Sequence, residues 1–312
     1  MIDGYPERAS VAPGETLVLR VSTDAPRFRV RIHRWAGELV PVSTTAWLPG
    51  RFAPPASAAD DWRWPEYEIA IPNDWLSAVY LAHLEEPGSA VPPGPAMDRA
   101  AALFVVRGAR RSPLLYKLPL ATYHAYNFTG GGCFYRNPTR SEAPPGSKVS
   151  LQRPGGGIGG AVWGALDYYD PSSPRQTFAH WDARFLGWLL CNGYEPELCT
   201  DFDIHEDASV LEDARLLVSV GHDEYWSEPT RDHVEAFVAA GGNAAFFGAN
   251  LCWWRIRVVD GGRAIVCHQG GPKGALDHWW PATGANRPED SLTGVSYRHG
   301  GGSWDGPRRT RG

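Results

Sequence analysis

The sequence predicts a chain of two parts, an antiparallel Ig-like β-sandwich over residues 1–110 and an α/β part with a parallel sheet over residues 111–312. Short runs of alternating apolar and polar residues, separated by Pro and Gly, continue to about Arg107. A tract rich in Gly and Pro then extends from Gly130 to Gly164, and helical and strand patterns follow it. Domain boundaries commonly fall at such changes of composition.

The runs of the first part are the right length for strands that bury one face. They read ETLVLRVST, FRVRIHRW, EYEIAIP, SAVYLAHL and ALFVVRG. Alternation over short segments with turn residues between them is typical of a sandwich.

The second part shows helical spacing followed by strand patterns. Apolar residues recur at steps of three and four over residues 178–189, and Asn192-Gly193 is a suitable C-terminal cap. Residues 215–220 predict a buried strand. Ser227 is placed to cap a helix through about Ala240, with Val234, Phe237 and Val238 facing inward, and residues 243–248 predict a second buried strand. Strand, helix and strand in this order give a right-handed parallel unit.

Composition excludes several classes of partner. The 312 residues carry a formal net charge of -5, so the chain has no basic footprint for nucleic acid or anionic membranes. Five cysteines without a CxxC pair predict free thiols. Small or neutral substrates remain open. No uninterrupted apolar run is long enough for a bilayer, and MIDGYPERAS lacks the features of a signal peptide, so we expect a cytoplasmic protein.

The first candidate site follows the predicted strands. His222 and Glu224 come directly after one strand, and Asn250 and Arg255 follow the next. Ligands of open parallel sheets bind at the carboxyl ends of strands. Since His222 and Glu224 are two residues apart, their side chains point the same way in an extended segment and can reach one ligand or metal. The alternative is an ordinary polar loop.

The second candidate site is the stretch TYHAYNFTGGGCFY, in which Tyr123, His124, Tyr126, Asn127 and Tyr135 surround a glycine run. Its functional interpretation is phenolate ligation or donation to an oxyanion, and its alternative is a glycine-rich loop held by aromatic packing. A tyrosine ionises near pH 10, so only a strongly acidic cation such as ferric iron makes the phenolate its resting form at neutral pH.

Common hydrolase motifs are absent from the sequence. FFGANLC lacks the cysteine elbow of class I amidotransferases, because Cys252 is displaced by two positions, and no G-x-S-x-G occurs. RPGGGIGG lacks the Lys-Ser/Thr ending of a phosphate-binding loop.

Several motifs together, in the same order, resemble the large (beta) subunit of N,N-dimethylformamidase and its relatives. They are GYPERASVAPGETLVLRVST, TYHAYNFTGGGCFY, VSLQRP, GHDEYWS, GGNAAFFGANLCWWRIR and RPEDSLTGV. The resemblance implies a β-sandwich followed by a class I amidotransferase-like, flavodoxin-like α/β domain. It also implies a mononuclear ferric iron held by two tyrosines and a glutamate with a histidine close by. That iron acts as a Lewis acid in hydrolysis of a small amide, with water as the nucleophile.

Carried over to this chain, Glu224 matches the glutamate ligand and His222 the adjacent histidine, while Tyr126 is the expected first phenolate. Relatives continue Arg-Pro with a tyrosine, whereas this chain has Gly155. Either the second ligand is lost, or it comes from Tyr168 or Tyr169, of which Tyr168 is our prediction.

Asn250 and Glu289 occupy family-like motifs and are expected to position the carbonyl and the water. The implied partners are a small accessory subunit and further copies of the chain. Relatives continue past LTGV, so an ending in GGSWDGPRRTRG is consistent with truncation and a disordered basic tail.

Two other functions remain open from the sequence. A binding protein with a degenerate amidotransferase-like domain fits the missing tyrosine. A metal-independent hydrolase would use Cys252 as its nucleophile.

Overall fold

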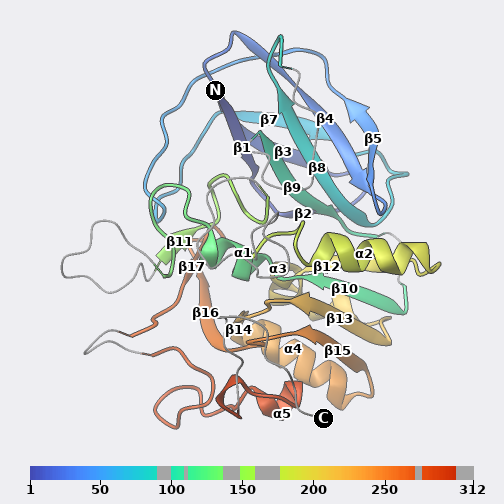
Figure 1. Ribbon diagram of the computed structural model, residues 1–312, viewed down its shortest axis with the longest axis vertical. Coiled ribbons are helices and arrows are strands. Elements are labelled where there is room, and N and C mark those ends of the chain that lie inside the picture. The colour runs from blue at the N-terminus through green and yellow to red at the C-terminus, as the bar shows by residue number, and fades with distance from the viewer. Residues whose placement is uncertain (90–99, 109–111, 136–147, 159–175, 271–275, 300–312) are drawn as a thin grey trace, which may run out of the picture.

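Two sheets form the first part of the chain in this computed structural model, which describes residues 1–89, 100–108, 112–135, 148–158, 176–270 and 276–299 (Figure 1). The smaller sheet is antiparallel and has the order β1 (Ile2–Pro6), β3 (Thr16–Thr23) and β7 (Glu66–Ala70). The larger sheet has the order β2 (Ser10–Val11), β9 (Ala101–Val106), β8 (Ala78–Glu85), β4 (Arg27–Trp35) and β5 (Leu39–Thr44), and β6 (Leu48–Pro49) also pairs with β4. All of its pairs are antiparallel except β2 with β9.

The two sheets share one hydrophobic core, which explains the alternation in the sequence. Leu17 and Leu19 of β3 and Val30 and Ile32 of β4 are fully buried in it, and Phe104 of β9 joins them. The intervening residues of β3 and β7 are partly exposed or exposed. A sheet with one buried and one solvated face produces this period of two.

Strands β8 and β9 depart from that alternation because both of their faces are covered. Every residue of β9, and every residue of β8 except Glu85, is buried. Tyr80 and Phe104 face the sandwich core, whereas Leu81, Leu103 and Val105 pack in a second core with residues of the α/β part. The two parts of the chain therefore share a continuous apolar interface.

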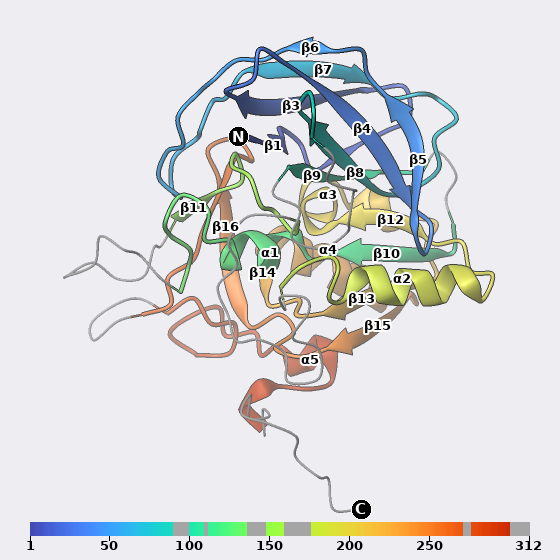
Figure 2. The ribbon, with the colours of Figure 1, turned by 45° about the horizontal axis from the view of Figure 1, so that its top comes forward.

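A parallel sheet organises the second part. Its order is β12 (Glu197–Thr200), β10 (Leu114–Leu118), β13 (Leu216–Gly221) and β15 (Asn243–Gly248). Around it lie α1 (Leu120–Tyr126), α2 (Asp182–Cys191), α3 (Asp201–Glu206) and α4 (Glu228–Ala239), and α5 (Asp290–Thr293) lies near the described C-terminal end (Figures 1 and 2). Short 3₁₀ segments cover Ala208–Leu211 and Tyr297–His299.

A further sheet was not predicted from the sequence. It has the order β11 (Lys148–Ser150), β17 (Ala264–Val266), β16 (Trp254–Val259) and β14 (Tyr225–Ser227). Strand β14 begins immediately after the His222–Glu224 segment and pairs in parallel with β16. This pairing fixes the far end of the segment that carries the candidate residues.

The predicted strand–helix–strand unit is present, with two corrections. Ser227 caps α4 by accepting a hydrogen bond from the Thr230 backbone, and β13 and β15 pair in parallel. Strand β15, however, is not buried: several of its residues are exposed, because it is the last strand of the described sheet. Val238 is also exposed rather than inward-facing, whereas Val234 is buried as predicted.

The overall class predicted from the sequence agrees with this mixed, sheet-rich arrangement of antiparallel and parallel sheets. Assignment of the two parts to the Ig-like and amidotransferase-like folds stays a prediction. The predicted boundary between residues 110 and 111 lies outside the described residues.

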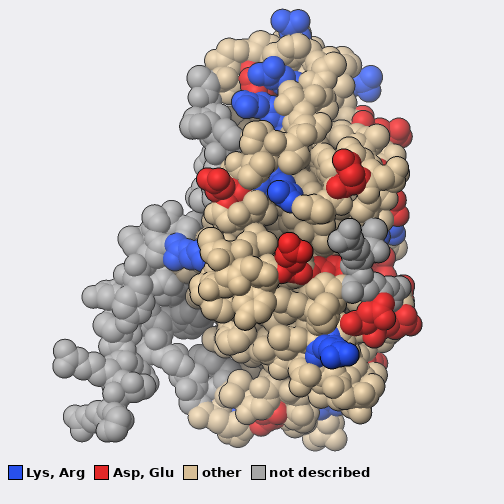
Figure 3. Space-filling view, turned by 90° about the vertical axis from the view of Figure 1, so that its right-hand side faces the viewer, with Lys and Arg blue, Asp and Glu red and all other residues tan. Residues whose placement is uncertain are grey.

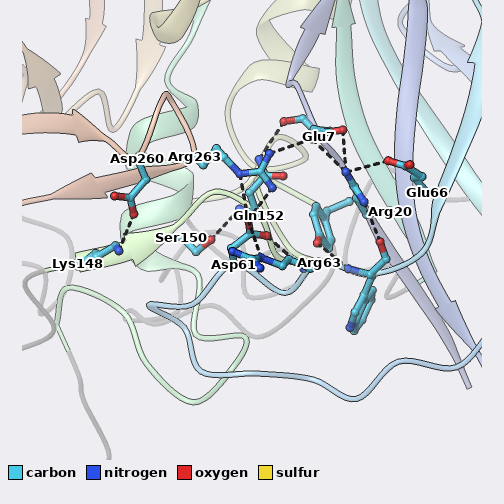
Figure 4. A network of polar contacts seen from close by, with 12 residues as sticks. Glu7, Arg20, Asp61, Arg63, Glu66, Lys148, Ser150, Gln152, Asp260 and Arg263 are labelled. Atoms are coloured by element: carbon cyan, nitrogen blue, oxygen red, sulfur yellow. Dashed lines mark hydrogen bonds and ion pairs between the residues drawn. The ribbon is translucent and has the colours of Figure 1, made fainter.

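Ion pairs reinforce the junction between the sandwich and the paired strands β11 and β17 (Figure 4). Arg263 binds Glu7 at 2.9 Å and Asp61 at 2.6 Å, and Glu7 also binds Arg20 at 3.1 Å. The Gln152 side chain donates to the Glu7 carbonyl at 2.9 Å. These contacts join segments far apart in the sequence, so they help to fix the position of the sandwich relative to the second part of the chain.

One face of the molecule carries few charged side chains (Figure 3). On the face drawn in Figure 3, Lys and Arg side chains lie mainly toward the sandwich end, Asp and Glu are distributed along the rest, and most of the surface is uncharged.

We expect Leu81→Ala to lower the free energy of unfolding of the whole chain. Leu81 is fully buried in the core that the two parts share, and truncation of such a residue costs about 2–5 kcal/mol. Calorimetry should show one unfolding transition moving to lower temperature, while Val42→Ala, at an exposed position of β5, should leave it nearly unchanged. Two separate transitions, only one of them shifted, would contradict a shared core.

Candidate active site

Glu224 is the centre of a buried oxygen cluster at the end of β13. The strand ends at Gly221, and residues 222–224 lead from it into β14. The Glu224 carboxylate receives the Tyr126 hydroxyl at 2.8 Å and lies 3.0 and 3.1 Å from the Tyr135 hydroxyl. Two phenols and a carboxylate from separate segments therefore meet at one place.

Helix α1 positions Tyr126 and also holds the Glu224 backbone. Tyr126 is the last residue of this helix, and every residue of the helix is buried. One turn earlier, Thr122 Oγ1 accepts hydrogen bonds from the backbone N–H groups of Glu224 at 3.0 Å and Tyr225 at 3.3 Å. Helix α1 thus contacts the same loop through the Thr122 hydroxyl and the Tyr126 phenol. These two contacts restrict how far the helix and the loop can separate.

His222 lies beside the cluster between two amide side chains. Its Nε2 is 3.3 Å from Glu224 Oε2 and 2.8 Å from Asn250 Nδ2, and its Nδ1 is 3.3 Å from Gln176 Nε2. In these orientations the buried side-chain oxygens of Asn250 and Gln176 have no hydrogen-bond partner among the described residues. Buried acceptors without a partner are costly in a folded protein, and a polar ligand at this place would satisfy them.

Asp223, between the two candidate residues, has a structural role. Its carboxylate contacts Lys117 Nζ and Ser219 Oγ, each at 2.6 Å, and accepts from the Trp226 indole N–H at 2.9 Å. The Lys117 ammonium also lies 4.4 Å from the centroid of the Trp226 ring. Since Lys117 and Asp223 are fully buried, this ion pair anchors the loop to β10 and β13.

Burial keeps the phenols of the cluster protonated in the protein alone. The pKa values of Tyr126 and Tyr135 are raised well above the usual range, first by loss of solvent and then by the negative charge of Glu224. Burial raises the pKa of Tyr225 in the same way. Phenolate at neutral pH would therefore require a compensating cation within the cluster.

The donor set fits a hard cation. Carboxylate and phenol oxygens bind hard cations such as ferric iron better than they bind soft ions. Tyr126, Tyr135 and Glu224 are the residues able to hold such a cation. Within the described ranges, no group of three or more His, Cys, Asp or Glu side chains is arranged to bind a metal. A metal at this place would accordingly depend on the tyrosines.

The predicted site residues fall into three groups. Tyr126, His222, Glu224 and Asn250 lie together as described above. Glu289 instead accepts hydrogen bonds from Ser296 and, at 3.3 Å, from Arg298. One of its carboxylate oxygens is buried and has no hydrogen-bond partner among the described residues. Tyr168 and Tyr169 lie outside the described residues.

Two further candidates from the sequence have other surroundings. Arg255 forms ion pairs with Glu228 at 3.1 Å and Asp277 at 3.6 Å. Cys252 is fully buried, and burial raises the pKa of its thiol. A nucleophilic cysteine needs access and a stabilised thiolate, so these surroundings disfavour a Cys252-dependent hydrolase.

Sequence reasoning missed several residues of the site. The sequence pattern singles out Tyr135 only as part of the glycine-rich stretch, and it gives no indication of Gln176, Lys117 or Thr122. The nearness of Tyr135 to Tyr126 in the sequence was the one available signal. The other three contact the site through tertiary packing, which leaves no motif in the sequence.

A cavity of about 590 Å³ lies elsewhere, between the sandwich and helices α1 and α3. His124, Asp203 and Arg263 are among its lining residues, but Tyr126 and Glu224 are not.

Within the part of the chain that the structure describes, no helix has the length and apolar character needed to cross a membrane.

We expect Lys117→Met to destabilise the chain by about 3–5 kcal/mol, because it leaves the Asp223 carboxylate buried without its partner. Adding Asp223→Asn should recover part of the loss, as measured by denaturant unfolding. The matched control is Lys148→Met, which removes a partly exposed pair with Asp260 and should cost about 1 kcal/mol or less. Equal effects of the two single substitutions would rule out a special role for the buried pair.

Comparison with known proteins agrees with the motifs of this site. The family described as "N,N-dimethylformamidase beta subunit-like, C-terminal" matches residues 30–310. The N,N-dimethylformamidase beta subunit of Alcaligenes sp is 28% identical over 78 residues, which are 25% of this chain and 10% of that protein. The aligned part is thus a small share of the relative's length. Because the family match covers most of the sequence, this chain belongs to the N,N-dimethylformamidase beta subunit-like family.

Proposed function

We propose that this chain is a hydrolase that cleaves the C–N bond of a small, formamide-type amide with the help of one ferric iron. Membership of the dimethylformamidase-like family supports hydrolase chemistry on amides. The single observation that carries the iron proposal is the convergence of Tyr126 and Tyr135 on the Glu224 carboxylate beside His222.

Bound iron would supply Lewis acidity, which stabilises negative charge on an amide oxygen and makes water a better nucleophile. Tyr126 and Glu224 would hold it, together with a second phenol. Their burial excludes bulk water, which strengthens electrostatic interactions inside the site.

His222 is the group suited to proton transfer. Its Nε2 faces both the Glu224 carboxylate and the Asn250 amide, so the orientation of the imidazole is set before substrate arrives. Asn250 and Gln176 also offer hydrogen-bonding groups on either side of the ring. A base held in this way near the reacting amide contributes about 10²–10⁴-fold to a rate.

The finer expectations from the sequence belong to this proposal. They are an Ig-like sandwich joined to an amidotransferase-like domain, a role for Glu289 in positioning water, a small accessory subunit, assembly with further copies and a cytoplasmic location. The alternative is a binding protein of the same fold without turnover, in which the buried polar cluster holds a ligand but no reaction follows.

We expect Glu224→Gln to lose iron and at least about 100-fold of the amide hydrolysis rate, because it removes the only carboxylate that Tyr126 and Tyr135 contact in the described cluster. Iron is measured by elemental analysis of protein purified without chelators, and hydrolysis by amine release from a panel of formamides.

Glu228→Gln is the matched control, since Glu228 is largely exposed at the start of α4. Its iron content and rate should equal those of the unaltered chain. Iron-free unaltered protein would refute the iron proposal, and bound iron without amine release from any amide would favour the binding protein.

A further inference from the structure

The cluster around Glu224 contains a second phenol in a position equivalent to that of Tyr126. The Tyr135 hydroxyl is 3.1 and 3.0 Å from Glu224 Oε1 and Oε2, and the Tyr126 hydroxyl is 2.8 Å from Oε2. The two rings lie side by side, with centroids 4.5 Å apart. Both hydroxyls therefore lie within hydrogen-bonding distance of one carboxylate.

Packing fixes the position of Tyr135. The preceding residue, Phe134, is fully buried, and its backbone N–H donates to the Ala125 carbonyl of α1 at 3.1 Å. The Phe134 ring also packs against Tyr225, with centroids 5.5 Å apart. Because the backbone and the ring of Phe134 are both anchored, Tyr135 is held at the cluster by the folded chain and not by its hydroxyl alone.

With the Gln269 amide in the orientation that pairs both its nitrogen and its oxygen, the hydrogen bonds around Tyr135 leave the cluster short of one proton. When the Gln269 amide donates to the Phe134 carbonyl at 3.0 Å, its oxygen accepts from the Trp254 indole at 3.2 Å and from the Tyr225 hydroxyl at 2.5 Å. Tyr225 has one proton, so its 2.6 Å contact with Tyr135 uses the proton of Tyr135.

Tyr135 then has no proton to give to Glu224, although the two groups are 3.0 Å apart. Two oxygen acceptors this close repel each other unless a proton or a cation lies between them. A cation bound by both oxygens would convert the repulsion into ligation.

The segment after Arg153 is a poor source of a phenol. Gly155 has φ +96°, a backbone conformation that disfavours every residue with a Cβ. A Cβ there would also lie 2.8 Å from Asn127 Oδ1 and 3.1 Å from Thr129 Oγ1. The backbone at this position is thus adapted to glycine.

We propose that Tyr135 is the second phenolate ligand of the ferric site, together with Tyr126 and Glu224. The inference rests on the proposed function and replaces the prediction of Tyr168 in that role. Binding transfers the two phenol protons to solvent and changes no oxidation state.

The test is a titration of the full chain with ferric citrate, followed by visible absorption and resonance Raman spectroscopy. Tyrosinate bound to ferric iron gives a charge-transfer band and phenolate vibrations, which a hydrogen-bonding tyrosine does not give. Tyr135→Phe and Tyr126→Phe should each weaken the band and lower iron affinity by at least about 10-fold, and the double variant should lose the band.

Three further variants make the result specific. Tyr168→Phe and Tyr169→Phe should keep the band and the affinity of the unaltered chain. Tyr80→Phe removes a buried hydroxyl in the sandwich, which donates to the Leu76 carbonyl at 2.9 Å, and should also leave both unchanged. If Tyr135→Phe fails to fold, as judged by near-ultraviolet circular dichroism, 3-fluorotyrosine at position 135 should shift the energy of the band.

The outcomes separate this inference from the proposed function. An unchanged band and affinity in Tyr135→Phe, or an unshifted band with 3-fluorotyrosine, overturns the inference while the iron hydrolase stands. Loss of the band in Tyr168→Phe or Tyr169→Phe alone also overturns it and assigns the ligand to that tyrosine. An unaltered chain that binds no ferric iron overturns both.

Discussion

The buried ion pair between Lys117 and Asp223 is the interaction on which the geometry of the candidate site depends. It connects the loop that carries His222 and Glu224 to two neighbouring parallel strands, and the Trp226 ring covers it. A buried carboxylate with this many partners has few alternative positions. The residues on either side of it, His222 and Glu224, are therefore held at a constant distance from the sheet, with their side chains in the oxygen cluster.

Helix α1 holds the other side of the cluster, which contains Tyr126. Helix α1 follows directly after β10, so the strand that carries Lys117 also leads into the helix that carries Thr122 and Tyr126. The loop that carries Glu224 and the helix that carries Tyr126 are thus both fixed relative to β10. This connection explains how a phenol and a carboxylate 98 residues apart can be kept within hydrogen-bonding distance.

The sandwich supports the site indirectly. Strands β8 and β9 are buried on both faces, because they separate the sandwich core from the core of the α/β part. The ion pairs of Arg263 with Glu7 and Asp61 reinforce the same junction from the β17 side. A substitution in the sandwich is therefore expected to affect the parallel sheet, although no sandwich residue contacts Glu224 through a described hydrogen bond or ion pair.

The sequence by itself determined five strands of the sandwich (β3, β4, β7, β8 and β9), the parallel pair β13 and β15, the cap of α4 and the proximity of His222 to Glu224. These features depend on local patterns: side-chain alternation, helical spacing, capping residues and a spacing of two in an extended segment. The pairing of Tyr126 with Glu224 came from the family resemblance, which links distant motifs that periodicity cannot link.

Only the tertiary structure decided that Tyr135 and Gln176 join the site, that Asp223 is an anchor for the loop and that Glu289 contacts Ser296 and Arg298. It also showed that several residues of β15 are exposed and that β14 pairs with β16 in a further sheet of the described residues. Each of these depends on which distant segments pack together. Contacts between distant segments follow from the sum of many weak packing interactions over the whole chain, so no short stretch of sequence contains them.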